Sequence, residues 1–345
     1  MEQRTDVAAE LEQAEPRRRI TFKNVFWLAV TGISLYLVFP SVIETLGSWR
    51  DITRFSVGSL LGMAALQVAS LACLWALQHV ALRAKRWPPV ITSQLAGNAL
   101  AKVAPGGGAL GAALQYRMLV QSGLPPAATV SALTAVNLLV FAVVLALPVL
   151  AIPALLRGAV DRGLLETAVI GLVIFFVASA IGAVLFSTDR PLAWIGRLAQ
   201  RIRNRLRRRH AEPLQHLPQR LLRERDRILA TLGPRWKRAL AATVGRWTFD
   251  YLTLLAALAA IGSHPRPGLV LLAFCGAQVL AQIPVTPGGL GFVEAGLTAM
   301  LALAGVGAGE AVLATFAYRL FSYWLPLPLG LAAFALHSRA SAAPG

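Results

Sequence analysis

The sequence predicts an all-α polytopic membrane protein with six full spans and two re-entrant helical hairpins, arranged as two inverted repeats. Of its 345 residues, 56% are apolar and 14% are charged, and the mean hydropathy is +0.61. This composition is too apolar for a water-soluble domain of that length. In addition, the triplet Pro-Gly-Gly at 105–107 returns at 287–289, each time between two short apolar runs.

Six apolar runs are each long enough to cross a bilayer core of about 30 Å. They lie at 22–40, 56–82, 126–152, 164–186, 238–262 and 309–336. The first run follows a polar leader without a small-residue cleavage pattern, so we expect a retained anchor. Residues 1–19 are expected to form a disordered cytoplasmic tail, and residues 339–345 a second, short tail.

An internal repeat accounts for the two glycine-rich triplets. Residues 99–138 align without gaps to residues 281–320 with 13 identities, against about four expected from this composition. The repeat predicts hairpins at 90–120 and 268–304, because each contains two apolar runs too short to cross singly. Two short tilted crossings are the alternative. Three full spans in each repeat would invert the second copy, an arrangement typical of secondary transporters.

Positive charge is concentrated between the two membrane regions. We place the first region, with the leading span of the second repeat, at 20–186, the loop at 187–237 and the second region at 238–338. Residues 187–238 hold 15 Arg and Lys against four acidic residues, a net charge of +11. The positive-inside rule places this loop and both termini in the cytoplasm. Attraction to anionic headgroups explains this charge better than nucleic-acid binding does.

Apolar residues recur at helical spacing between Leu192 and Leu206, so we expect an amphipathic helix on the inner membrane surface. The basic residues predicted to lie at that surface are Arg201, Arg203, Arg205, Arg207, Arg208 and Arg209. Cys73 and Cys275 lie in apolar runs, and the histidines lack metal-ligand spacing. We therefore expect no disulfide, no metal and no cofactor.

Charged residues inside apolar spans are costly, which makes each of them a functional candidate. Arg246 and Asp250 are four residues apart and can pair on one helix face. Glu294 follows the second Pro-Gly-Gly, and Arg319 lies within the last span. Lys102, before the first triplet, could reach an anionic headgroup. The alternative is a neutral set of ion pairs that holds the helices together.

The glycine-rich turns precede helix starts, whose free N–H groups and positive dipole suit an anion. The alternative is that glycine merely permits a tight turn and close helix packing. Gly106, Gly108 and Gly111 also satisfy the G-x-G-x-x-G pattern. Because no strand is expected before them, a dinucleotide site is excluded.

Three segments carry a family resemblance. Residues 287–294 (Pro-Gly-Gly-Leu-Gly-Phe-Val-Glu) and 318–326 (Tyr-Arg-Leu-Phe-Ser-Tyr-Trp-Leu-Pro) resemble the transmembrane, flippase-like region of the lysylphosphatidylglycerol synthetase family. Residues 246–250 are similar to that family's Asn-Trp-x-x-Asp segment, with Arg246 in place of Asn. The chain departs from the family at Val136-Asn137, where members often carry Glu-Arg, and its first glycine motif lacks a final acidic residue.

The resemblance covers most of residues 20–338 and implies a stand-alone translocation module. Full synthetases carry a soluble aminoacyl-transferase domain after the last span, whereas eight residues follow His337 here, so lipid aminoacylation is not expected. The lipid-headgroup candidates are Lys102, Gly106, Gly107, Arg246, Asp250, Gly288, Gly289, Glu294, Tyr318 and Arg319.

We therefore expect a bacterial plasma-membrane protein that binds and translocates a lipid or lipid-linked headgroup, without its own ATPase. Its expected partners are membrane lipids, anionic or isoprenoid-linked, and no nucleic acid. One alternative is an intramembrane lipid-modifying enzyme with Glu294 or Asp250 as its base. The other is a scaffold that docks a cytoplasmic transferase on the basic loop.

Overall fold

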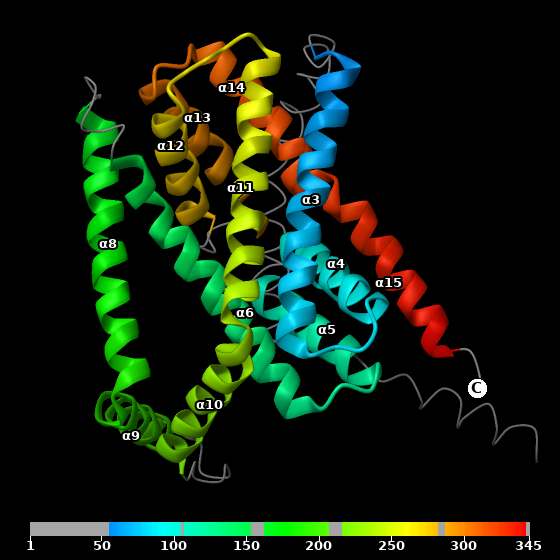
Figure 1. The fold of residues 1–345 in the computed structure, drawn as a ribbon, viewed down its shortest axis with the longest axis vertical. Helices are drawn as coiled ribbons and strands as arrows, with labels where there is room; N and C mark the ends of the chain where they lie inside the picture. The colour runs from blue at the N-terminus through cyan, green and yellow to red at the C-terminus, as the bar shows by residue number, and fades with distance from the viewer. Residues whose placement is uncertain (1–54, 105–106, 153–161, 207–215, 282–286, 343–345) are drawn as a thin grey trace, which may run out of the picture.

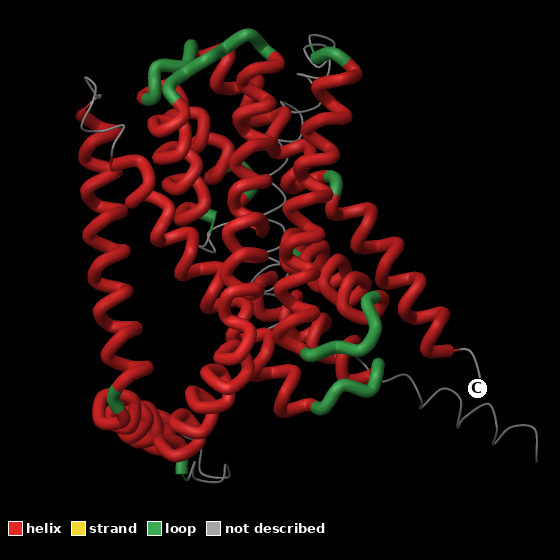
Figure 2. Tube along the Cα trace, in the orientation of Figure 1, coloured by secondary structure: helices red, strands yellow, loops and turns green. Residues whose placement is uncertain are grey.

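The computed structural model describes residues 55–104, 107–152, 162–206, 216–281 and 287–342. Every regular element in these ranges is a helix, and none of the described residues forms a strand (Figure 2). The predicted all-α class is therefore confirmed for this part of the chain. The expected first span at 22–40 and the tail at 1–19 lie outside the described residues.

Three helical segments of the described chain are both long and apolar enough to cross a membrane. They are α3 (Val57–Leu82), α6 (Pro126–Ala146) with the 3-10 helix η2 (Leu147–Ala151), and α14 (Ala308–Arg319) with the π-helix η5 (Leu320–Trp324) and α15 (Pro326–Ala342). They coincide with the spans expected at 56–82, 126–152 and 309–336. These long apolar helices establish the membrane-protein class.

Two further long helices coincide with expected spans. α8 (Arg162–Ser187) has 26 residues and α11 (Trp236–Ala260) has 25. At about 1.5 Å per residue each exceeds the roughly 30 Å of a bilayer core. α11 carries the ionisable residues Arg246 and Asp250 in its middle. The count of six spans stays a prediction.

Four short helices form two antiparallel pairs, of which the second is strongly apolar. α4 (Pro88–Val103) packs on α5 (Gly107–Gln121), and α12 (Pro267–Leu280) packs on α13 (Phe292–Leu303). α4 and α5 approach so closely that a Cβ on Gly97 would lie 2.8 Å from the Gly111 carbonyl oxygen. The two pairs lie in opposite halves of the molecule (Figure 1).

Local sequence signals set several helix ends. Ser56 caps α3 by accepting a hydrogen bond from the backbone N–H of Ser59 at 3.1 Å. Proline occupies the first turn of α4, α6 and α12, where its missing N–H would have had no partner within the helix. α3 ends at Arg83, whose φ of 49° stops further helical hydrogen bonding.

The core is built on α11, which packs along α3, and on α12 and α13 beside it. Phe274 of α12 is fully buried and contacts Trp247 of α11 edge to face, with ring centroids 6.1 Å apart. α15 packs along α4, and a Cβ on Gly330 would lie 2.5 Å from the Leu95 carbonyl oxygen. The last helix is thereby held against the first short-helix pair.

The expected amphipathic segment is α9 (Asp189–Leu206), which packs against α10 (Leu217–Leu232) at one end of the molecule (Figure 1). Arg225 of α10 pairs with Asp189 at 2.7 Å and with Asp226 at 2.9 Å. Hydrogen bonds to Asp226 and Asp189 raise the pKa of Arg225 above its usual range. A hydrogen bond from Ser131 to Glu224 ties α10 to α6.

The structure describes three of the six arginines predicted to lie at the membrane surface. Arg201, Arg203 and Arg205 are exposed on α9, and exposed Trp194 and Ile202 lie on the same helix. Arg207, Arg208 and Arg209 lie outside the described residues. The helix therefore presents both basic and large apolar side chains to its surroundings, as an interfacial helix does.

Candidate functional site

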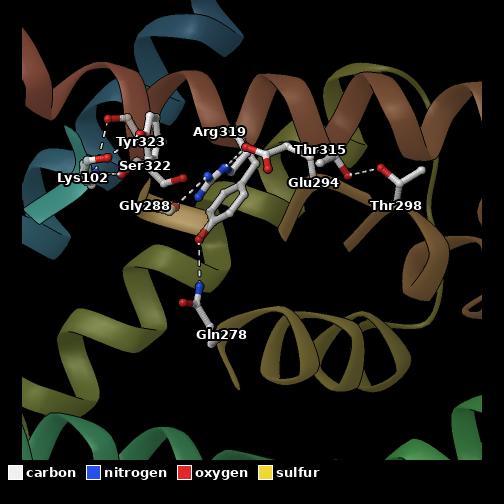
Figure 3. Close-up of polar contacts among 10 residues, drawn as sticks. Lys102, Gln278, Gly288, Glu294, Thr298, Thr315, Arg319, Ser322 and Tyr323 are labelled. Carbon is white, nitrogen blue, oxygen red and sulfur yellow. Dashed lines mark hydrogen bonds and ion pairs between the residues drawn. The ribbon is translucent and has the colours of Figure 1, made fainter. Parts of the chain in front are cut away.

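An ion pair links the second short-helix pair to the last long segment. Arg319, at the end of α14, donates through Nε to Oε1 of Glu294 in the first turn of α13, at 2.6 Å. Arg319 is 8% exposed and Glu294 is 9% exposed. Arg319 also donates through Nη2 to the carbonyl oxygen of Gly288 at 3.4 Å (Figure 3). One guanidinium therefore joins both sides of the second glycine-rich turn to α14.

Lys102 lies in the last turn of α4, in the first short-helix pair, and its side chain contacts the π-helix η5. Its Nζ donates to the carbonyl oxygens of Ser322 at 2.7 Å and Tyr323 at 3.2 Å. The Ser322 carbonyl is available because the residue four positions later is Pro326, which has no N–H. In return, the Tyr323 hydroxyl donates to the Lys102 carbonyl oxygen at 3.0 Å (Figure 3).

Tyr323 lies between the two cations. Its ring centroid is 5.0 Å from Lys102 Nζ and 4.5 Å from Arg319 Cζ. Both distances fall in the range of attractive cation–π contacts. The ring is 2% exposed, so solvent does not screen these contacts in the way it would at a surface. Tyr323 therefore connects the cation of the first short-helix pair to that of the second.

The second glycine-rich turn meets the end of α4 at this point. Gly288 has a φ of 60°, and a Cβ there would lie 2.5 Å from Tyr323 Cε2 and 2.9 Å from the Lys102 carbonyl oxygen. Gly289 and Gly107 are buried beside them. Gly106, also predicted for this site, lies outside the described residues. Glycine is needed at 288 because both the backbone conformation and the contacts exclude a side chain.

Arg246 and Asp250 lie one helical turn apart on α11, but no nitrogen–oxygen distance between them is within 4.0 Å, so they form no direct ion pair. The Arg246 guanidinium stacks instead on the neighbouring Trp247 ring, 4.3 Å from its centroid. Asp250 is 6% exposed and faces the Tyr318 hydroxyl and the Gln67 side chain. The pairing expected from their spacing is therefore wrong.

The five charged side chains nevertheless form one group, which we call the ion cluster. Its members are Lys102, Arg246, Asp250, Glu294 and Arg319. Lys102 interacts electrostatically with Arg319, Asp250 and Arg246, and Asp250 with Arg246. Tyr318 joins the cluster to α12, because its hydroxyl accepts a hydrogen bond from Gln278 Nε2 at 3.0 Å. The cluster therefore draws on α4, α11, α13 and α14.

Several polar atoms of this region are buried without a hydrogen-bond partner. In or beside the ion cluster they are Arg246 Nη1, Asp250 Oδ1, Glu294 Oε2, Gln67 Oε1 and Ser322 Oγ. Each such atom costs about 1–3 kcal/mol if it stays unsatisfied. Their concentration where the second glycine-rich turn meets the end of α4 indicates a place for a polar ligand or for water.

Sequence reasoning missed Ser322 and Tyr323 as parts of the site, whereas Gln67 was a plausible cavity-lining residue. Tyr323 and Ser322 act partly through backbone carbonyls, which no side-chain pattern reports. Pro326 was the available signal, since a proline inside a helix frees the carbonyl four residues earlier. Among the described residues, no group of three or more His, Cys, Asp or Glu side chains could hold a metal, and Cys73 and Cys275 are free.

Comparison with known proteins identifies the family to which this chain belongs. A UPF0104 membrane protein of Methanothermobacter thermautotrophicus is 30% identical over 91 residues, which is 26% of this chain and 26% of that protein. The chain thus matches about a quarter of that relative's length. Residues 24–330 match the family described as the lysylphosphatidylglycerol synthase TM region. This match includes both glycine-rich turns and the whole ion cluster, and the chain belongs to the family of lysylphosphatidylglycerol synthase transmembrane regions.

Proposed function

We propose that this protein binds the headgroup of a membrane lipid at the ion cluster and translocates the lipid across the bilayer, without an ATPase of its own. The acyl chains stay in the hydrocarbon while the headgroup passes between the two short-helix pairs. The lipid leaves chemically unchanged. Family membership supports a membrane role, and the position of the buried charges supports the headgroup site.

The arrangement of the short helices supports an inverted repeat. α4 and α5 lie in the half of the molecule that contains α9 and α10, whereas α12 and α13 lie in the other half (Figure 1). Each pair turns back at a glycine-rich segment in the middle. Two re-entrant hairpins that enter from opposite sides and meet at depth match the broken-helix architecture of secondary transporters. Non-helical backbone at that depth is acceptable where it lines a polar site.

The observation that carries the proposal is the meeting of the second glycine-rich turn with the end of α4 beside unsatisfied charged groups. Arg246 Nη1, Asp250 Oδ1 and Glu294 Oε2 are buried without partners. A purely structural ion-pair network would satisfy these atoms, because an unpaired buried charge destabilises the fold strongly. A headgroup that visits the site would supply the missing partners.

The basic surface of α9 and α10 gives the proposed orientation. We place it on the cytoplasmic side of a bacterial plasma membrane, together with both termini, by the positive-inside rule. Exposed Arg201, Arg203 and Arg205 would contact anionic headgroups there. A lipid drawn to this surface would then lie near the half of the molecule that holds α4 and α5.

Reconstituted proteoliposomes test the proposal. Fluorescent phosphatidylglycerol in the outer leaflet should become exchangeable with the inner leaflet faster than in empty vesicles, as read by chemical quenching from outside. Arg319→Gln should slow the exchange, whereas Arg339→Gln, at the exposed end of α15 and outside the ion cluster, should not. Exchange at the empty-vesicle rate for a range of headgroups would refute translocation. Mass spectrometry of the recovered lipid should find it unaltered, and a new product would indicate an intramembrane enzyme instead.

A further inference from the structure

The formal charge of the ion cluster indicates which net charge its ligand should carry. Three cations, Lys102, Arg246 and Arg319, face two carboxylates, Asp250 and Glu294, which leaves one positive charge in excess. The undescribed segments next to the turns, 105–106 and 282–286, contain no ionisable residue. They cannot alter this balance. An unneutralised charge at membrane depth is costly, so the site favours a ligand with one negative charge.

Lys102 supplies the excess charge. Arg319 is paired with Glu294 at 2.6 Å, and Arg246 lies one helical turn from Asp250. Among the described residues, Lys102 has no carboxylate within ion-pair distance. Its ammonium has three N–H donors, and two of them go to the Ser322 and Tyr323 carbonyl oxygens. The third N–H is available to an anion.

A second donor is available beside Lys102. Arg246 is electrostatically coupled to Lys102, and its Nη1 is buried without a partner. A phosphodiester has two non-bridging oxygens that share one negative charge. Each of these oxygens can accept one charge-assisted hydrogen bond, one from Lys102 and one from Arg246.

Three of the remaining unpartnered atoms can only accept hydrogen bonds. Asp250 Oδ1, Glu294 Oε2 and Gln67 Oε1 each lack a donor, and a carboxylate cannot supply one. Hydroxyl groups on the ligand would satisfy them without changing its charge. An ammonium group could also donate, but it would restore the positive excess that the phosphate neutralises.

We infer that the ion cluster selects a lipid whose headgroup is a phosphodiester with one negative charge and free hydroxyl groups, such as a glycerol or sugar phosphodiester. This inference rests on the proposed function and adds the ligand's chemistry. A zwitterionic headgroup leaves the site at one positive charge, and a dianionic phosphomonoester reverses it to one negative charge. The lysylated lipid in the family's name carries a net positive charge, so it is disfavoured here.

The test compares five labelled lipids in the proteoliposome assay with the full chain. They are phosphatidylglycerol, phosphatidylmethanol, phosphatidylethanolamine, phosphatidic acid and lysylphosphatidylglycerol. Phosphatidylglycerol should exchange about tenfold faster than phosphatidylethanolamine, phosphatidic acid and lysylphosphatidylglycerol, because its headgroup, unlike theirs, cancels the single positive charge in excess at the site. Phosphatidylmethanol has the same charge and no hydroxyl, so it should exchange at an intermediate rate.

Three variants test whether Lys102 and Asp250 determine which lipid headgroup is preferred. Lys102→Gln removes the excess charge and should bring the phosphatidylglycerol to phosphatidylethanolamine ratio close to one, whereas Lys102→Arg should keep it high. Asp250→Asn raises the excess charge to two and should favour phosphatidic acid. Lys237→Gln is the matched control, because Lys237 also lies over an aromatic ring but is exposed at the start of α11. Its ratio should equal the wild-type ratio.

Each outcome decides between the two proposals. Equal rates for all five lipids, or a preference for phosphatidic acid or lysylphosphatidylglycerol in the wild type, would overturn the monoanion inference while translocation stands. Equal rates for phosphatidylglycerol and phosphatidylmethanol would overturn the hydroxyl requirement alone. No exchange above empty vesicles for any lipid would overturn translocation itself. The wild-type comparison decides the matter even if Lys102→Gln fails to fold.

Discussion

Gly288→Ala is the most direct test of the contact between the second glycine-rich turn and the end of α4. The new Cβ would lie 2.5 Å from Tyr323 Cε2, 2.8 Å from the Tyr323 hydroxyl oxygen and 2.9 Å from the Lys102 carbonyl oxygen. Neither neighbour can yield easily. The ring is fixed between two cations and by its own hydrogen bond, and the carbonyl belongs to the backbone of α4.

Two costs add in this variant. A non-glycine residue at a φ of 60° costs about 1–2 kcal/mol. Overpacking against fixed neighbours costs about 1–3 kcal/mol more. We therefore expect Gly288→Ala to destabilise the protein by about 2–5 kcal/mol, or a melting temperature lower by about 5 °C or more. Lipid exchange should fall as well, because the displaced ring releases the contact with Lys102.

A thiol-reactive dye that reports exposure of buried Cys275 on heating would measure the melting temperature in detergent. Gly62→Ala is the matched control. Gly62 lies on the exposed side of α3, and a Cβ there meets nothing within 4 Å. Alanine favours a helix over glycine by about 1 kcal/mol, so the control should melt at the wild-type temperature or slightly above it. Equal melting of the two variants would refute the packing argument.

Three further predictions concern other contacts. Glu294→Gln leaves the Arg319 guanidinium buried without its carboxylate and should cost about 3–5 kcal/mol in thermal melting, whereas adding Arg319→Gln should recover part of that loss. Gln94→Leu removes the acceptor of the Trp75 indole N–H, which lies 2.9 Å away, and should cost about 1–3 kcal/mol. Arg225→Ala should leave the melting temperature unchanged but speed limited proteolysis of α9 and α10.

Each of these has an outcome that would contradict it. Additive losses for Glu294→Gln and Arg319→Gln would mean that the two side chains do not interact in the folded protein. Unchanged stability of Gln94→Leu would mean that Trp75 finds another acceptor. A large drop in melting temperature for Arg225→Ala would mean that α10 belongs to the cooperative core rather than to its edge.

The sequence was sufficient for the helical class and for part of the site. Long apolar runs can only be helices in a bilayer, which is why the expected ranges 56–82 and 126–152 match α3 and α6 with η2 closely. Glu294 and Arg319 were identified because ionisable residues are rare in spans. Their direct contact follows from the antiparallel packing of α13 and α14.

Contacts that depend on tertiary packing could not be read from the chain. The spacing of Arg246 and Asp250 favours an ion pair on an isolated helix, yet the Trp247 ring offers the guanidinium a closer partner. The partner of Lys102 lies 220 residues away, in a backbone carbonyl of the π-helix. No pairwise rule on side chains predicts such a contact, because it requires the fold of both short-helix pairs.

Pro326, directly after the π-helix, makes a hydrogen bond possible between two segments that are distant in the sequence. A lysine side chain in α4 completes a hydrogen bond that α15 cannot make for itself. Lys102 therefore links α4 to the π-helix and to α15 behind it. Pro326→Ala would supply a backbone N–H that can donate to the Ser322 carbonyl oxygen within the helix. Lys102 would then be free to bind another partner, and the contact between α4 and the π-helix would weaken although the lysine itself is unchanged.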